Sequence, residues 1–185
     1  RANGSSKIEL AGFPYHSLDN YLPKLVRAGQ RVAICDQLED PKKTKGIVKR
    51  GITELVTPGV AYHDNVLDNK KNNFLASIFY SNKNIGISFL DISTGEFMIS
   101  EGNINYIEKL IESFKPSELI CQKSEREKNI KQFTDKLHSF FLEDWVFAKD
   151  YANELLKEKF GIKSLKGFGV EHLKLGVISA GAILH

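Results

Sequence analysis

Apolar residues in the first thirty positions recur at helical spacing. Between Ser17 and Ala28 they fall on one face of a helix: Leu18, Tyr21, Leu22, Leu25 and Val26. Ser17 is the expected N-cap of this helix, and Gly29 is its expected end. Pro23 is unusual inside a helix, so the regular helix either starts near Asn20 or is kinked at the proline.

Two strands are expected after this helix. The continuous apolar run Val32–Cys35 predicts a buried strand over residues 31–37. A second strand is predicted over residues 53–57 and is closed by Pro58 and Gly59. Together with the helix they predict a small α/β unit.

Beyond residue 73 the pattern changes to three strands followed by alternating helices and strands. Strands are predicted over 74–80, 85–92, 96–100, 118–121 and 140–147, and helices over 104–114, 124–137, 151–160 and 173–184. An antiparallel meander followed by alternating elements predicts a mixed sheet with helices on its faces. The polar stretch between these two patterns is the expected linker. We therefore expect an α/β fold with one domain over 1–60, a linker over 61–73 and a second domain over 74–185.

Composition is typical of a folded protein without a membrane span. The chain has 185 residues, of which 42% are hydrophobic and 26% charged, which excludes the disordered class. No apolar run reaches the roughly 20 residues that a membrane helix needs. Cys35 and Cys121 lie far apart in apolar surroundings, which predicts two reduced core thiols and a cytosolic compartment.

Positive charge gathers in the N-terminal third. Residues 1–60 contain ten Lys or Arg and six Asp or Glu, whereas the overall net charge is only +3. The basic residues concentrate in one loop: Lys42, Lys43, Lys45, Lys49 and Arg50. Such a run attracts phosphate without reading sequence, and an ordinary solvated loop explains it equally well.

Five short motifs follow one another along the chain. They are AGFPYH at 11–16, VAICDQLEDP at 32–41, VTPG at 56–59, LDISTGEF at 90–97 and GFGVE at 167–171. In this order they resemble the MutS family of DNA mismatch repair proteins over essentially the whole chain. The resemblance implies the C-terminal part of a mismatch-binding domain, followed by most of a ribonuclease H-like connector domain.

The resemblance also implies partners and cofactors. The parent protein is expected to bind mismatched duplex DNA as a homodimeric clamp in the bacterial cytoplasm, at the nucleoid, and to use ATP and Mg²⁺ in a C-terminal domain. This stretch lacks the P-loop pattern GxxxxGK[ST], so no enzyme activity and no cofactor are expected within it. The connector is expected to relay the nucleotide state to MutL.

Candidate DNA contacts lie near the turn that opens the first helix. Gly12, Pro14, Tyr15 and His16 form either a turn whose aromatic rings pack inward, or a helix N-terminus that offers N–H groups and a tyrosine hydroxyl to phosphate. In the resemblance, Arg1 corresponds to an arginine that touches a DNA phosphate. Lys42, Lys43 and Lys45 complete the expected DNA-binding set.

Two sets of residues are missing from their expected places: the base-wedging motif of the family and the metal-binding carboxylates of a nuclease. The family wedges the phenylalanine of a Phe-x-Glu motif into the DNA, but the one such pattern here, at 141–143, falls in the connector part, so the wedge is expected upstream of Arg1. A ribonuclease H-type nuclease needs several carboxylates for two metal ions. Residues 74–80 carry no acid, Asp91 is expected to be a turn or capping residue and not a ligand, and the histidines show no metal-ligand spacing. A pure protein-interaction module is the third alternative.

Overall fold

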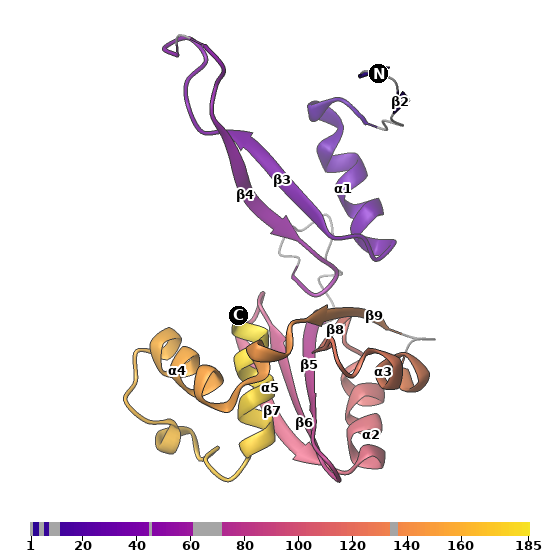
Figure 1. Ribbon diagram of the computed structural model, residues 1–185, viewed down its shortest axis with the longest axis vertical. Helices are drawn as coiled ribbons and strands as arrows, with labels where there is room; N and C mark the ends of the chain where they lie inside the picture. The colour runs from indigo at the N-terminus through magenta and orange to yellow at the C-terminus, as the bar shows by residue number, and fades with distance from the viewer. Residues whose placement is uncertain (1, 4–5, 8–11, 45, 61–71, 134–136) are drawn as a thin grey trace.

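The computed structural model describes residues 2–3, 6–7, 12–44, 46–60, 72–133 and 137–185 (Figure 1). They form an N-terminal unit, residues 12–60, and a C-terminal unit, residues 72–185. Two short strands, β1 (Ala2–Asn3) and β2 (Ser6–Lys7), pair with each other ahead of the N-terminal unit. In the described part of the chain no helix is long and apolar enough to cross a membrane.

The N-terminal unit is one helix on a two-stranded ribbon. A 3-10 turn, η1 (Tyr15–Ser17), leads directly into α1 (Leu18–Arg27), and β3 (Val32–Gln37) pairs antiparallel with β4 (Arg50–Val56). The apolar face of α1 packs on the ribbon through a small core: Leu22, Val26 and Val56, with Leu18, Val32 and Ile34 at its edge. The predicted helix and both strands are therefore present.

The two ends of α1 differ from each other in how they are capped. Ser17 occupies the N-cap position, but its side chain makes no capping hydrogen bond. At the other end Gly29 has φ +80°, and the Gly29 and Gln30 N–H groups donate to Val26 and Leu25, which is a Schellman motif. The glycine stop is confirmed. Pro23 lies inside the helix, which starts at Leu18, so the alternative start near Asn20 is wrong.

The prediction that β3 is a buried strand is wrong. Alternate residues along β3 are exposed, and Cys35 is among them. The reason is that β3 pairs with β4 alone and packs against α1 on one face, so the other face meets solvent. Cys121 is fully buried, as expected, so only one of the two cysteines is a core thiol.

The C-terminal unit is a five-stranded mixed sheet. Its strands are β5 (Phe74–Tyr80), β6 (Ile85–Asp91), β7 (Glu96–Gly102), β8 (Glu118–Gln122) and β9 (His138–Leu142). They lie in the order β7-β6-β5-β8-β9, antiparallel among the first three and parallel from β5 to β9. The predicted mixed sheet is confirmed.

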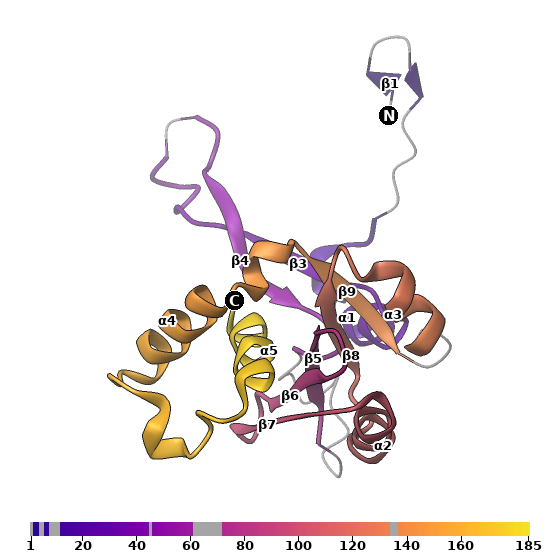
Figure 2. The ribbon, with the colours of Figure 1, turned by 60° about the horizontal axis from the view of Figure 1, so that its bottom comes forward.

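Helices cover both faces of this sheet (Figure 2). On one face lie α2 (Ile104–Phe114) and α3 (Arg126–Phe133), and on the other lies α5 (Lys174–Leu184), against which α4 (Lys149–Phe160) packs. Because both faces are covered, β5 and β6 are almost continuously apolar and buried.

In the C-terminal unit the predicted ends of two elements differ most from the structure. The strand predicted over 140–147 ends at Leu142, and Asp144–Phe147 forms a 3-10 turn, η2. Val146 and Phe147 are buried because this turn folds them onto α5 and β5, not because they continue the strand. Likewise the helix predicted to residue 137 does not reach it, because α3 is described over Arg126–Phe133 and Leu137 is not helical; residues 134–136 fall outside the described residues. A further 3-10 turn, η3 (Leu165–Phe168), follows α4.

Candidate nucleic-acid interface

The first component of the candidate interface is the turn before α1. The Ser17 N–H donates to the Pro14 carbonyl over 2.9 Å, so the hydrogen-bonded turn spans residues 14–17 and starts at Pro14. Pro14 itself is extended, with φ −63° and ψ 146°. The first N–H groups of a helical segment have no acceptor within its own ladder, and they carry the positive end of the helix dipole. Tyr15 and His16 therefore stand where an anion is favoured.

The aromatic side chains of this turn do not pack inward. Tyr15 is 75% exposed, and Phe13 is stacked on Tyr21 with ring centroids 4.6 Å apart and both rings partly in solvent. Lys24 lies 5.3 Å from the centroid of the Tyr21 ring. The inward-packing alternative is thus wrong for Tyr15, whose hydroxyl is available to a ligand. Gly12 is exposed, and among the described residues nothing lies within 4 Å of an added Cβ.

The second component is the loop between β3 and β4. It begins with a turn in which the Asp40 carboxylate accepts from the Lys42 N–H over 3.0 Å and the Asp40 carbonyl accepts from the Lys43 N–H over 3.0 Å. Across the loop, the Leu38 N–H donates to the Lys49 carbonyl, and Glu39 accepts from the Lys49 N–H. The acidic side chains thus order the loop backbone. Lys42, Lys43 and Lys49 remain exposed.

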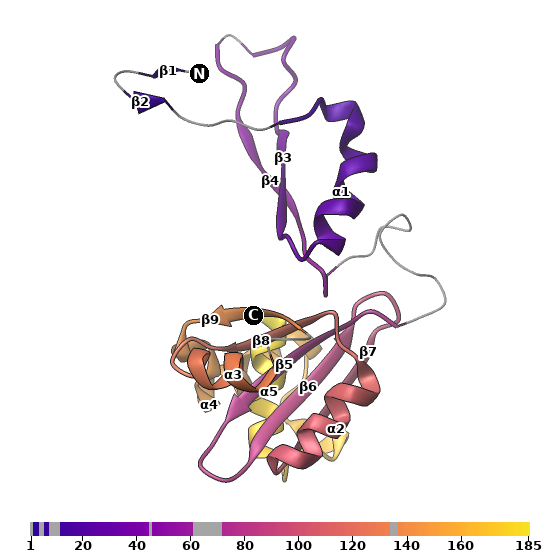
Figure 3. The same ribbon diagram turned by 90° about the vertical axis from the view of Figure 1, so that its right-hand side faces the viewer.

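Both components lie at the same end of the N-terminal unit, away from the C-terminal unit (Figures 1 and 3). The chain enters α1 at that end, and the β3–β4 loop extends beyond the ribbon there. We name this end, with Gly12, Pro14, Tyr15, His16, Lys42, Lys43 and Lys49, the basic end. Arg1 and Lys45, also expected to contact DNA, fall outside the described residues.

Sequence reasoning missed a highly exposed apolar residue at the basic end. Ile47 is 98% exposed in the β3–β4 loop, beside the lysines. An isolated isoleucine between Gly46 and Val48 gives no periodic signal, so nothing in the sequence distinguishes it from a core residue.

The C-terminal unit shows no sign of a metal-dependent nuclease in its described residues. Asp91 is fully buried and accepts from the Asn73 N–H (3.0 Å), the Ser93 N–H (2.9 Å) and the Ser93 hydroxyl (2.6 Å). Burial raises the pKa of this carboxyl, but the hydrogen bonds outweigh burial and hold its pKa below the usual value. The prediction that Asp91 is a turn or capping residue is confirmed in its second form, because Asp91 ends β6 and its carboxylate caps the turn that follows. Among the described residues no three His, Cys, Asp or Glu side chains gather as metal ligands would.

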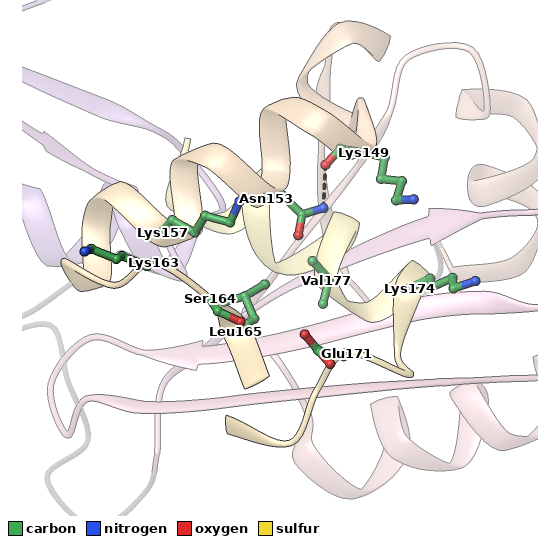
Figure 4. Close-up of a pocket in the computed structure, with 9 residues that line it drawn as sticks. All are labelled: Lys149, Asn153, Lys157, Lys163, Ser164, Leu165, Glu171, Lys174 and Val177. Atoms are coloured by element: carbon green, nitrogen blue, oxygen red, sulfur yellow. Dashed lines mark hydrogen bonds between the residues drawn. The ribbon is translucent and has the colours of Figure 1, made fainter. Parts of the chain in front are cut away.

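A pocket of about 390 Å³ lies between α4, η3 and the start of α5 (Figure 4). Four lysines line it: Lys149, Lys157, Lys163 and Lys174. The other lining residues are Asn153, Ser164, Leu165, Glu171 and Val177. The lysine ammonium groups point in different directions in Figure 4, and that of Lys157 pairs with Glu154 at 3.0 Å. They do not converge on one ligand position.

The fold and the basic end define a two-domain α/β protein, and comparison with known proteins supplies its family. The profile of MutS domain I matches residues 1–65, and that of MutS domain II matches residues 73–185. The chain belongs to the MutS family and carries these two domains.

Individual relatives agree along the whole chain. It is 57% identical over 185 residues to the DNA mismatch repair protein MutS of Christiangramia forsetii and 60% identical over 184 residues to that of Flavobacterium johnsoniae. It is 59% identical over 186 residues to the MutS of Cytophaga hutchinsonii. Each match covers 100% of this chain but only 21% or 22% of the relative. The chain thus spans about a fifth of the length of the curated relatives it matches.

Proposed function

We propose that this chain serves DNA mismatch repair by holding the backbone of mismatched duplex DNA at its basic end. The observation that carries the proposal is the position of the helix N-terminus at Tyr15 and His16 at the same end as the lysine loop. Helix N-termini and lysines both favour phosphate, and phosphate contacts fix a duplex in place without reading its sequence. Arg1 and Lys45 belong to the proposed contact set through the family resemblance.

We propose, further, that the C-terminal unit relays the nucleotide state of the parent protein to MutL. ATP and Mg²⁺ would act in another part of a dimeric parent, outside these residues. The proposed compartment is the bacterial cytoplasm at the nucleoid, where duplex DNA is found. A pull-down of the N-terminal region of MutL by this chain tests the relay. Retention of MutL supports it, and failure to retain MutL argues against a docking surface on this chain.

The proposed domain boundaries are 1–60 and 74–185, joined by residues 61–73. The sequence between the two patterns is polar, with Asp64, Asn65, Asp68, Asn69, Lys70 and Lys71. Limited proteolysis is expected to cut there and to leave a resistant piece that starts near Asn73. Preferential cutting inside residues 74–97 would contradict these boundaries.

Duplex binding with lysine variants tests the DNA proposal. The double variant Lys42→Ala/Lys43→Ala is expected to weaken binding of a fluorescent duplex and to reduce the salt slope by about 0.9 for each phosphate that is no longer neutralised. The matched control is Lys109→Ala/Lys131→Ala, which removes two exposed lysines from α2 and α3 in the C-terminal unit. Equal weakening in both double variants would place the DNA-binding surface elsewhere or make the attraction purely long-range.

A further inference from the structure

A buried carboxylate lies where the two units meet. Glu118 is the first residue of β8 and is 3% exposed. Its Oε2 accepts from the Thr57 hydroxyl and, over 3.1 Å, from the Gly59 N–H, and its Oε1 lies 3.8 Å from Nε of Arg31. All three of these partners belong to the N-terminal unit. The VTPG motif at 56–59 therefore begins at the last residue of β4 and supplies two hydrogen-bond donors, Thr57 and Gly59, to the C-terminal unit.

The neighbouring strand β9 contributes the second contact. The Arg31 guanidinium lies 3.5 Å from the centroid of the Phe140 ring. His138, which pairs with Glu118 in the sheet register, lies against Gly29, where an added Cβ would come within 2.2 Å of its ring. The segment between α1 and β3 thus packs against β9 and the first residue of β8.

Asn73 of the C-terminal unit also contacts this turn. Its side-chain amide donates to the Pro58 carbonyl over 3.0 Å, and its Oδ1 accepts from the Ser117 hydroxyl over 2.6 Å. Its own N–H donates to Asp91, the residue of the LDIS motif that ends β6. Two sequence motifs that the DNA proposal leaves without a role are therefore parts of one joint.

The joint is tightly packed around Gly59. An added Cβ at Gly59 would lie 2.8 Å from the Leu75 side chain and 3.0 Å from the Glu118 side chain. Relative motion is the usual expectation for two domains unless their interface is extensive. Here the orientation is set by directional contacts, because a buried carboxylate needs its donors in fixed places and is costly when one of them is removed. The Arg31 pair alone is weak, since that side chain is 32% exposed.

We infer that Glu118 is a positioning residue that fixes the orientation of the N-terminal unit on the C-terminal unit. Arg31, Thr57 and Gly59 supply the charge and the hydrogen bonds that it requires. The basic end lies at the opposite end of α1 and the β3–β4 ribbon from this joint (Figures 1 and 3). Any rotation at Glu118 would swing the basic end relative to the C-terminal unit. This role of Glu118 belongs to the free chain and does not depend on DNA or MutL binding.

The test is the distribution of distances between the two units, measured by pulsed electron paramagnetic resonance on the whole chain. One spin label goes on the exposed native Cys35 of β3, and the other on a cysteine introduced as Lys109→Cys on α2, while Cys121 is buried. The variants Glu118→Gln, Thr57→Val and Arg31→Met each remove one part of the joint. The matched controls are Glu127→Gln on α3 and Arg50→Met at the far end of β4, both exposed.

We expect a narrow distance distribution in the chain without a joint substitution and in the controls. In Thr57→Val and Glu118→Gln the distribution should be at least about twofold broader, with a smaller effect in Arg31→Met. Thr57→Val and Arg31→Met leave the C-terminal sequence intact, so they decide the question if Glu118→Gln does not fold. The inference would be overturned if the distance distributions of Thr57→Val and Arg31→Met were as narrow as that of the chain without a joint substitution. Equal broadening in the controls would also overturn it.

Discussion

The Ser179 hydroxyl donates a hydrogen bond to the backbone carbonyl of Ser77, over 2.6 Å, at the buried contact between α5 and β5. The same hydroxyl lies 2.8 Å from the Ser88 hydroxyl of β6. Within the described part of the chain the side-chain hydroxyl of Ser77 is buried and has no partner. Ser179 therefore ties α5 to both β5 and β6, whereas Ser77 contributes only its backbone carbonyl to this contact.

This difference predicts opposite outcomes for two equal truncations. Ser179→Ala removes both bonds and leaves the Ser88 hydroxyl unsatisfied, so the free energy of unfolding should fall by about 1–3 kcal/mol. Ser77→Ala removes a buried hydroxyl that has no partner, so it should leave stability unchanged or raise it. Urea unfolding of the two variants measures both values. A larger loss in Ser77→Ala than in Ser179→Ala would contradict the described packing of α5.

The lowered pKa of Asp91 predicts an acid-dependent contribution to stability. Because the folded-state pKa lies below the ordinary value of 3.8, the ionised carboxylate stabilises the fold above that pH. The contribution declines as the pH falls below 3.8 towards the folded-state pKa. The free energy of unfolding of the unsubstituted chain should thus exceed that of Asp91→Asn at pH 7, and this difference should shrink in acid. Urea unfolding at pH 7 and below pH 3.8 measures the difference between the two chains. A difference that stays constant would contradict the lowered pKa of Asp91.

The two cysteines should differ sharply in reactivity. Cys35 is exposed on β3, whereas Cys121 is fully buried in β8, and burial raises the pKa of the Cys121 thiol far above its usual value. A thiol reagent at mildly alkaline pH should therefore modify Cys35 in the native chain and Cys121 only after unfolding. Peptide mapping after a short reaction measures this. Modification of both at similar rates would show that β8 is not buried as described.

Apolar patterns predicted the C-terminal unit better than the N-terminal one. The spans 74–80 and 104–114 match β5 and α2 residue for residue, because a fully covered strand and an amphipathic helix leave clear patterns. The same logic failed for Val32–Cys35, where an apolar run lies on a ribbon with one open face. It also extended β9 through Phe147, since a buried 3-10 turn is as apolar as a strand.

The candidate interface was predictable only in part. The lysine loop was visible as a charge run, and the turn at Pro14 as a helix start. Their common position depends on how α1 lies along the ribbon, which no local pattern encodes. The joint at Glu118 was hidden for a similar reason, because its donors lie 61 and 59 residues away in sequence, at Thr57 and Gly59. A single acid at the start of a strand carries no sign of such partners.

If the basic end holds DNA through phosphate, the chain should bind matched and mismatched duplexes alike. The only Phe-x-Glu pattern in this chain lies at 141–143 in and just after β9, where Phe141 is half-buried and Glu143 pairs with Lys123. We therefore expect affinity without mismatch selectivity. The dissociation constant should be on the order of 10⁻⁴ M or weaker at physiological salt and should rise steeply with salt.

The decisive measurement is fluorescence anisotropy with a homoduplex and a duplex containing one G·T mismatch. It compares the unsubstituted chain with the triple variant Lys42→Ala/Lys43→Ala/Lys45→Ala. We expect equal affinity for the two duplexes and weaker binding by the triple variant to both. No detectable binding at low salt, or unchanged binding by the triple variant, would contradict the phosphate contacts. A clear preference for the G·T duplex would contradict the expectation that the wedge lies outside this chain.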